Sequence, residues 1–501
     1  MFKLKIIYDK IYLEVRAMFL FDNIDLIIYA SIGGLLLLLI LIVLLKAACF
    51  KDKTNYNVKK EVTFEKDDVV YKLGEMLKYQ TITYEDKSKI DYEVFQKYID
   101  RVKELYPLVF SKCEFTQTKE YAIKLKLKGK SSEKPTVLMA HFDVVPVTEG
   151  WDHDPFLGEV VDGYLYGRGS IDTKCTMACA LSALEVALKD DYVPLNDLYL
   201  CFGSNEEIYG DSQVKIVEEL KKEGVKPHLV FDEGGGIIDK AFPGVDKPSA
   251  MVGVVEKGMV NVKLTIDTNG GHSSTPKRNG PIIRMSKALV RLEKNHMKAN
   301  ITKTNKELLN IMGRNSTFAY KIIFANMWLF KGLVKALFPI LSADTNALLT
   351  STFAFTVING GNQTNVIPNH VEANLNVRVA SFNTPEEVVN HVKKVIKDKD
   401  IVVTAHDVNK MYPECDYKHP GYKLIKETII ETYNDTIVTP FTMLGGTDAR
   451  HYNEISDCVI RFSPIRLTNE DRKGIHGLNE KIKVEALENC LEFYQRLLTK
   501  I

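Results

Sequence analysis

The sequence predicts an α/β protein with a mostly parallel sheet, interrupted by an inserted α+β domain and preceded by one transmembrane helix. Three observations predict this class. Continuous apolar runs alternate with helical patterns between residues 135 and 232, as in parallel sheets that are covered on both faces. Strands with one polar face replace this pattern between about 258 and 378. An uncharged apolar run occupies residues 26–45, near the N-terminus.

The composition is that of a globular protein with more than one domain, because the chain has 501 residues, of which 45% are hydrophobic and 26% charged. Its formal net charge of +1 creates no field that would attract nucleic acid, so we expect no nucleic-acid partner. The eight cysteines include no CxxC pair, and we interpret Cys175 and Cys179 as buried apolar residues rather than metal ligands.

The run from Leu26 to Leu45 contains no charge and has about the ~20 residues that a bilayer-spanning helix needs. A signal peptide has a shorter apolar core and a small-residue cleavage site. We therefore interpret the run as a single-pass anchor between an N-terminal tail (1–25) and a lysine-rich linker (46–61). Four basic residues precede the run and five follow it, a difference too small to decide which side of the membrane the rest of the chain occupies.

The first domain is predicted to begin at residue 62 and to run to 257. Strands and helices that alternate build a parallel sheet, whose ligands bind outside the carboxyl ends of the strands. The predicted strands are the apolar runs at 136–140, 198–202 and 229–231, and helical spacing predicts one helix around 177–188 and another from Asp211 or Ser212 to Gly224.

Acidic residues and a histidine follow these strands. His141 and Asp143 end the first strand, where the two-residue side-chain period points them to the same face. A neutral imidazole can bind zinc while a neighbouring carboxylate orients its ring. So many carboxylates at one sheet edge are costly unless cations neutralise them, which predicts a metal site. The remaining acids at this edge are Asp172, Glu206, Glu207, Asp232 and Glu233.

The second domain, at 258–378, is predicted from two stretches in which polar and apolar residues alternate. It contains His272 in a Gly-Gly-His-Ser-Ser segment and Asn365 in an Asn-Val-Ile-Pro turn. An aromatic, weakly amphipathic stretch from Tyr320 to Leu341 has two interpretations. It forms packed helices of this domain, or it is a surface that touches the membrane or an acyl chain.

The segment 379–501 is predicted to complete the first domain, with a strand at Asp457–Phe462 and a final helix at Val484–Leu498. Two loops stand out in it. One reads Leu-Gly-Gly-Thr-Asp-Ala-Arg450, and the other is flanked by glycines and carries His476. A second isolated histidine would supply the ligand that a carboxylate-rich zinc site lacks.

With these residues assembled, the chain resembles the zinc metallopeptidase family that contains carboxypeptidase S, aminoacylase, glutamate carboxypeptidase and succinyl-diaminopimelate desuccinylase. The resemblance covers about residues 62–501. The anchor, the long middle domain and the Trp151-Asp-His-Asp-Pro-Phe stretch look most like the carboxypeptidase S branch, which includes N-fatty-acyl-amino-acid synthase/hydrolases. The motifs that carry the resemblance are, in order, Ala140-His-Phe-Asp-Val-Val-Pro, Gly167-Arg-Gly-Ser-Ile-Asp-Thr-Lys, Glu206-Glu207, Asp232-Glu233-Gly, the His272 segment, Gly-Gly-Thr-Asp-Ala-Arg450 and His476.

The resemblance implies a zinc-peptidase catalytic domain with an inserted lid and dimerisation domain, and a centre of two zinc ions. It implies that Asp143 orients His141 from behind and that Glu206 is the general base of the reaction. The implied metal ligands are Asp172, bridging both ions, with His141 and Glu233 (or its neighbour Asp232) for one ion and Glu207 and His476 for the other.

The resemblance also implies a substrate with a free carboxylate, which Arg450 would bind through both of its terminal nitrogens. His272 would donate a hydrogen bond to the developing oxyanion, reaching the site of a partner subunit in a homodimer, and Asn365 would help to bind the carboxylate. We therefore expect a membrane-anchored hydrolase that cleaves the amide bond next to a C-terminal amino acid, as a carboxypeptidase of the Gly-X type or an N-acyl-amino-acid hydrolase.

Three alternatives remain at this point. The first is an N-fatty-acyl-amino-acid synthase/hydrolase, and the second is a catalytically silent module that keeps the fold and binds metal. The third is a zinc aminopeptidase, which should hold the free amine of its substrate with an acid, whereas Arg450 fits a carboxylate.

Overall fold

The computed structural model describes residues 2–55, 68–409 and 411–501. The end of the expected linker and the first residues of the expected first domain fall at 56–67, outside the described residues. The chain divides into two compact units. One contains Met1–Lys53 and Gly313–Lys331, and the other contains Thr54–Met312 and Gly332–Ile501.

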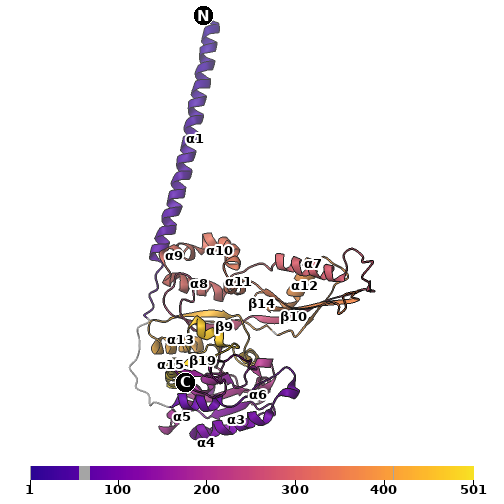
Figure 1. Ribbon diagram of the computed structural model, residues 1–501. Helices are drawn as coiled ribbons and strands as arrows, with labels where there is room; N and C mark the ends of the chain where they lie inside the picture. The colour runs from indigo at the N-terminus through magenta and orange to yellow at the C-terminus, as the bar shows by residue number, and fades with distance from the viewer. Residues whose placement is uncertain (1, 56–67, 410) are drawn as a thin grey trace. The chain divides into compact units, whose positions relative to one another are not determined.

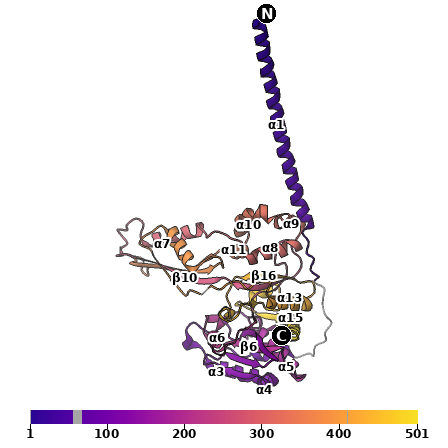
Figure 2. The same cartoon turned by 180° about the vertical axis from the view of Figure 1, so that it is seen from behind.

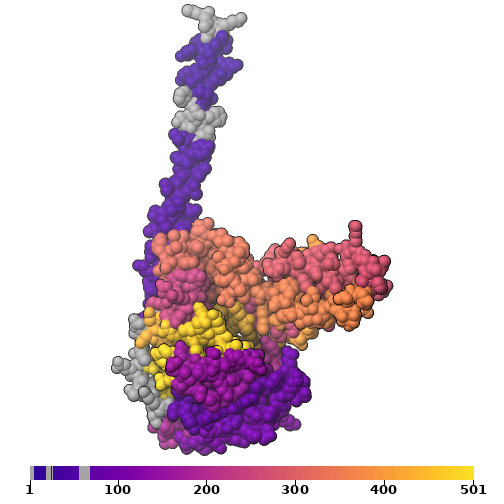
Figure 3. Space-filling model, in the orientation of Figure 1, coloured from indigo at the N-terminus to yellow at the C-terminus, as the bar shows by residue number. Residues whose placement is uncertain are grey.

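The first unit is built around helix α1 (Phe2–Cys49). Its segment Leu26–Cys49 is long and apolar enough to cross a membrane, with a mean hydropathy of 2.9. Figure 3 shows this helix as a column of side chains that is uncovered over most of its length. Residues 2–25 of the expected tail are helical too, because that stretch contains no glycine or proline to end a helix.

Helix α9 (Phe318–Phe324) packs against the carboxyl-terminal end of α1 (Figure 1). The Asn326 side-chain amide donates to the Val43 carbonyl oxygen at 3.0 Å. The Asn315 amide donates to Asp52 Oδ2 at 2.7 Å. Val43 is buried in this contact region, so the end of α1 is attached to a segment nearly 300 residues later in the chain.

The second unit contains a ten-stranded mixed sheet whose centre is parallel. On β3, Leu138 and Ala140 face one core cluster while Val137 and Met139 face the other, so both faces are buried. This confirms the predicted α/β class, in which apolar runs are continuous because neither face meets water. In sheet order the strands are β1 (Glu114–Gln117), β2 (Ile123–Leu127), β6 (Asn196–Gly203), β3 (Ser131–His141), β7 (Leu229–Asp232), β17 (Val459–Arg461), β9 (Ser249–Glu256), β8 (Gly236–Ile238) and β18 (Arg466–Leu467), with β16 (Ile437–Met443) paired to β9.

Helices cover both faces of this sheet. Helix α5 (Lys174–Lys189) is buried almost all around because other helices and β3 pack against it. Helix α6 (Ser212–Lys222) covers the opposite face and ends before Gly224, whose φ of +73° suits a glycine. The remaining elements are α2 (Val69–Leu77), α3 (Tyr92–Leu105), α4 (Pro107–Lys112), α13 (Pro420–Thr432), α14 (Asn469–Gly474), α15 (Val484–Leu498) and a small antiparallel sheet of β4 (Val160–Val161), β5 (Tyr164–Tyr166) and β19 (Lys481–Lys483).

A second, antiparallel sheet forms the inserted domain, which we define as Gly258–His406. Along β10 and β14 buried apolar side chains alternate with polar ones and pack with those of α7 and α12, and α7 lies on one side of β10 in both views (Figure 1, Figure 2). In sheet order the strands are β12 (Thr352–Asn359), β14 (His370–Val379), β10 (Gly258–Asp267) and β15 (Val402–His406). The helices in this range of the chain are α7 (Pro281–Lys294), α8 (Lys303–Asn315), α10 (Met327–Leu341), α11 (Ala343–Leu349) and α12 (Pro385–Ile396), while α9 belongs to the first unit, and β11 (Gly271–His272) pairs with β13 (Val366–Ile367).

The inserted domain extends beyond residue 378, where its end was expected. Helix α12 buries Val388, Val392 and Ile396 in the core of this domain. Strand β15 pairs with β10, with Asn261 opposite His406. The expected boundary therefore falls inside the domain, because a helix and a strand that return to the same sheet give the same pattern as a new α/β segment.

Replacing Ile396 by alanine tests this assignment of α12. Ile396 is 2% exposed, so the cavity left behind should lower the free energy of unfolding by about 2–5 kcal/mol. Urea denaturation of the detergent-solubilised protein, followed by circular dichroism, measures the change. Lys393→Ala, on the solvent-facing side of the same helix, should leave stability nearly unchanged. Equal effects of both substitutions would contradict the packing.

Candidate metal centre and active site

His141 is the last residue of β3, so the buried parallel strand holds its imidazole rigidly at the sheet edge. Its Nδ1 donates to the Asp143 carbonyl oxygen at 2.9 Å. Since a carbonyl can only accept, this bond leaves Nε2 as the nitrogen available to a metal ion. Nε2 lies 3.1 Å from Asp172 Oδ1 and 3.2 Å from Glu233 Oε1.

A second group of ligand atoms uses the other oxygen of the same carboxylate. His476 Nε2 lies 3.1 Å from Asp172 Oδ2 and 3.0 Å from Glu207 Oε2. His476 has a φ of +57°, which non-glycine residues seldom adopt. Asp172 therefore faces one histidine with each of its two oxygens, and it is the only residue shared by these two sets of contacts.

The spacing of both groups fits zinc. Two ligands at about 2.0–2.1 Å from a tetrahedral ion lie about 3.3 Å apart, and the four separations above are 3.0–3.2 Å. Imidazole nitrogens and carboxylate oxygens are also donors that zinc takes. The residues present could thus hold two ions, one on each side of Asp172.

Between the two adjacent acids that follow β7, Glu233 faces the histidine. Asp232 is turned the other way, and its Oδ2 accepts a hydrogen bond from the Ala449 backbone nitrogen at 3.0 Å. Of the two alternatives left by the sequence, the structure places Glu233 in the cluster.

Asp143 binds the backbone of the two adjacent glutamates, Glu206 and Glu207. It is fully buried, and it accepts hydrogen bonds from Thr83 Oγ1 at 2.9 Å and from the backbone nitrogens of Glu206 and Glu207, both at 3.1 Å. Glu206 offers a carboxylate oxygen within 4.8 Å of ligand atoms of His141 and Glu233. Thr83 was not singled out from the sequence, because nothing in its neighbourhood resembles a motif.

The electrostatics of the cluster favour bound positive charge. Burial raises the pKa of Glu233 to about 8 and raises the pKa of Glu206 well above its ordinary value. Hydrogen bonds to the carboxylates of Asp172 and Glu207 raise the pKa of His476 to about 10. Each of these shifts stabilises a bound proton, as expected where carboxylates crowd together without a cation. Divalent ions would neutralise the same excess of negative charge.

A buried ion pair, Arg168 with Glu480, connects the loops that carry Asp172 and His476. Glu480 Oε1 accepts from the backbone nitrogens of Ile171 at 2.8 Å and Asp172 at 3.1 Å. Glu480 Oε2 accepts from Arg168 Nη1 at 2.7 Å. Arg168 Nη2 in turn donates to the carbonyl oxygen next to His476, that of Gly477, at 2.7 Å. We call this pair the clamp, because one carboxylate and one guanidinium fasten both loops.

Arg450 lies in the turn of 3-10 helix η3 (Asp448–Glu454) and is buried. Its Nη1 donates to the Thr447 carbonyl oxygen at 2.8 Å, and its guanidinium carbon lies 5.3 Å from the ring centre of Tyr209. Tyr209 lies two residues after Glu207 and accepts a hydrogen bond from Arg378 at 3.2 Å. Two guanidinium groups thus converge on Tyr209, of which the sequence had indicated only Arg450.

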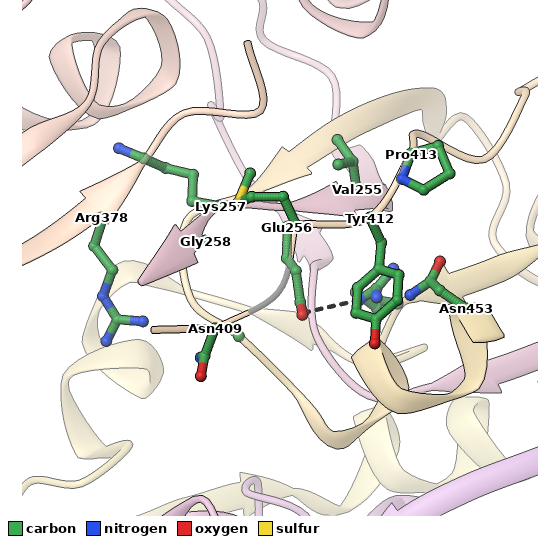
Figure 4. Close-up of a pocket in the computed structure, with 12 residues that line it drawn as sticks. Val255, Glu256, Lys257, Gly258, Arg378, Asn409, Tyr412, Pro413 and Asn453 are labelled. Carbon is green, nitrogen blue, oxygen red and sulfur yellow. Dashed lines mark hydrogen bonds and ion pairs between the residues drawn. The ribbon is translucent and has the colours of Figure 1, made fainter. Parts of the chain in front are cut away.

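Arg378 also lines a pocket beside the two segments through which the chain passes between the central sheet and the inserted domain (Figure 4). Glu256, at the end of β9, accepts from Arg461 at 3.1 Å and from the Thr447 backbone nitrogen at 3.0 Å. These bonds fix the glycine-rich loop that leads to Arg450. The pocket therefore adjoins the loop that positions this arginine.

His272 lies in β11 of the short β11–β13 ladder of the inserted domain, and Asn365 directly precedes β13. The Ser273 backbone nitrogen donates to the Asn365 carbonyl oxygen at 3.1 Å, and His272 Nδ1 lies 2.8 Å from Ser274 Oγ. Both side chains are exposed. The structure places these two residues next to each other. None of their contacts given above links them to the ligand residues around Asp172.

Comparisons with known proteins give a family match and several relatives. The profile of peptidase family M20/M25/M40 matches residues 137–500. An N-fatty-acyl-amino acid synthase/hydrolase of Danio rerio is 37% identical over 372 residues, which are 73% of this chain and 72% of the relative. The probable carboxypeptidase S-like 2 of Dictyostelium discoideum is 30% identical over 440 residues, 86% of this chain and 84% of the relative.

Among solved structures, the fold is similar to that of an M20 family metallo-carboxypeptidase from Sulfolobus solfataricus. The two superpose with a TM-score of 0.65 at 20% identity, covering 86% of this chain and 99% of the other. At this level of identity the likeness concerns the fold.

The clamp gives a direct test of how the site is supported. Glu480→Gln should lower the free energy of unfolding by about 3–5 kcal/mol, because it leaves the buried Arg168 charge without its counterion. Chemical denaturation measures the loss. Glu485→Gln removes a similar pair, with Lys483, that is exposed to solvent, and should change nothing measurable. A Glu480→Gln protein as stable as this control would show that the ion pair does not support the loops.

Proposed function

The chain belongs to peptidase family M20/M25/M40, and from this membership we propose that it is a membrane-anchored hydrolase that uses two zinc ions to cleave the amide bond next to a C-terminal amino acid. The observation that carries the proposal is the pair of ligand groups that share Asp172, with Glu206 beside them. Family membership establishes a metallopeptidase or amidohydrolase. The number and identity of the metals, the anchoring and the substrate belong to the proposal.

In this proposal His141, Glu233 and Asp172 would hold one ion, and Glu207, His476 and Asp172 would hold the other. Two bound zinc ions would lower the pKa of a shared water and stabilise the oxygen that becomes negative during attack on the amide carbonyl. Asp143 keeps the His141 ring in place, because its carbonyl oxygen accepts from Nδ1.

Glu206 is proposed to move the proton. Its backbone is bound to Asp143 and its carboxylate lies next to the His141 group without belonging to the closest ligand contacts. From this position it can take a proton from the attacking water and deliver it to the nitrogen that leaves as the amide bond breaks. A base at this place distinguishes an active hydrolase from a silent metal-binding relative.

The substrate is proposed to be a peptide or N-acyl amino acid whose free carboxylate is bound by Arg450. Arg450 and Arg378 meet at Tyr209, two residues after Glu207, so positive charge lies close to the reacting groups. Relatives named carboxypeptidase S-like and N-fatty-acyl-amino acid synthase/hydrolase support both an amino-acid carboxylate and an acyl group of variable length. Synthesis of N-fatty-acyl amino acids is the second candidate function, favoured by the 37% identity to the Danio rerio protein.

His272 and Asn365 are proposed to approach the substrate from an inserted domain, either on closure of this chain or from a second copy in a homodimer. Their shared ladder supports a joint movement, since β11 and β13 are bonded to each other. The anchor in this proposal is α1, whose apolar segment Leu26–Cys49 spans the bilayer once.

Glu206→Gln tests the division of roles between the two glutamates. The full-length protein in detergent is assayed against N-acetyl amino acids, N-fatty-acyl amino acids and N-blocked dipeptides, before and after chelation. Glu206→Gln should lose about 10²- to 10⁴-fold in rate and still bind two metals by elemental analysis. Glu207→Gln, its neighbour, should lose activity together with one metal.

The results of these assays distinguish the proposed hydrolase from a silent metal-binding module. Full activity of Glu206→Gln would reject it as the base. Two bound metals with no hydrolysis by the unmodified protein would reject the proposed substrates, and absence of metal would favour the silent module.

Arg450→Lys tests recognition of the carboxylate. A lysine keeps the charge but loses the paired hydrogen bonds, so kcat/KM for substrates with a free carboxylate should fall roughly 10- to 100-fold. The same substrates with a C-terminal amide should show no further loss. An equal loss for both substrate series would mean that Arg450 serves the structure of its loop.

A further inference from the structure

Helix α10 (Met327–Leu341) is apolar apart from Lys331 and Lys335, which lie one turn apart. Between Ser316 and Leu341 the only charged residues are three lysines, Lys321, Lys331 and Lys335, and there is no acid. A broad apolar helix surface of this kind is expected to be covered by a protein core or by lipid. The exposure of the side chains of α10 therefore indicates whether protein or lipid covers the helix.

Protein covers only one side of α10. Val334 is 2% exposed, whereas the side chains on the opposite face are about half exposed or more, up to 80% for Ile340. The exposed face is continuous along the helix, because its members recur at the spacing of three and four residues that marks one side. They are Leu329, Leu333, Leu337 and Ile340, with Trp328 at the first turn, and Leu341 is exposed at the last position of the helix.

The start of this helix lies at the end of α1. Within the first unit, Asn326 donates to the Val43 carbonyl oxygen, and Lys46 Nζ lies 5.4 Å from the centre of the Trp328 ring. Val43 and Lys46 are in the last two turns of α1, where an anchor helix would leave the hydrocarbon region. Trp and Lys are residues that favour the boundary between lipid and water.

Neither α9 nor α10 can cross a bilayer by itself. They have 7 and 15 residues, and at about 1.5 Å per residue the longer one reaches only about 22 Å, less than the ~30 Å hydrocarbon core. Together they are bent by 102° at the break between them. An apolar face of this length, flanked by lysines without acids, is typical of a helix that lies in the plane of an anionic membrane surface.

We propose that α9 and α10 lie in the lipid–water interface of the membrane that α1 spans, with Trp328, Leu333, Leu337 and Ile340 inserted among the acyl chains and Lys331 and Lys335 next to anionic headgroups. The inference rests on α1 as the anchor and is independent of the catalytic proposal. It assigns this apolar face to the bilayer rather than to a second copy of the chain.

Tryptophan fluorescence can test this, because the chain contains only Trp151 and Trp328. Full-length Trp151→Phe carries one reporter at the start of α10. A triple variant, Trp151→Phe with Trp328→Phe and Ile340→Trp, moves the reporter to the other end of the helix. Both are reconstituted in vesicles of phosphatidylcholine and phosphatidylserine whose acyl chains carry bromine either near the headgroup or near the chain end.

Quenching of both reporters, stronger with shallow than with deep bromine, is the expected result. Three results would overturn the proposal. The tryptophan at position 340 is quenched by iodide and not by bromine, or it is protected from both, which means that a second copy covers the face. The third is stronger quenching by deep than by shallow bromine. Trp328→Phe, which retains Trp151, provides the baseline. Alkaline extraction of the vesicles tests the α1 anchor separately.

Paired substitutions then test the face itself. Leu333→Glu with Leu337→Glu should abolish bromine quenching at position 340, because two charges cannot enter the acyl region. Val193→Glu with Leu195→Glu is the matched control, since those residues are exposed to a similar extent (49% and 52%, against 47% and 44%) outside α9 and α10. Lys331→Gln with Lys335→Gln should weaken quenching in vesicles that contain phosphatidylserine and have little effect without it. Unchanged quenching in the Leu333/Leu337 variant would reject the assignment.

Discussion

The candidate site depends on the position of one carboxylate, that of Asp172. Its two oxygens face two histidines that come from opposite ends of the catalytic domain, and each contact tolerates little displacement. The backbone of Asp172 is therefore bound at its own nitrogen by Glu480, and the loop of His476 is bound through Arg168 to the same glutamate. A buried ion pair of this kind contributes little net stability, but it holds the loops of Asp172 and His476 in a fixed position relative to each other.

The parallel sheet supplies the rest of the site. Strands β3, β6 and β7 run side by side in the same direction, so the residues after their ends meet although they are separated by about 90 residues in the chain. For this reason the fold class and the sheet edge that carries the acids could be predicted from apolar runs and the residues that follow them. The prediction of family membership drew on the same residues, and the comparisons confirmed it.

Other features could not be predicted from the sequence. Whether Asp232 or Glu233 faces the histidine depends on the backbone direction after β7, which adjacent acids do not reveal. Glu480 acts through hydrogen bonds to backbone nitrogens far away in the sequence, and Arg378 reaches Tyr209 from the inserted domain. The limit of that domain depends on which sheet β15 joins, a choice made by tertiary contacts rather than by local pattern. The roles of the individual ligands and of Glu206 stay predictions.

The support that Asp143 gives to both glutamates has a consequence for how such a protein can diverge. One buried carboxylate binds the backbone of the residue proposed as base and of the residue proposed as ligand. Changes at Asp143 would therefore disturb both roles together, whereas a change confined to the Glu206 side chain leaves this scaffold in place.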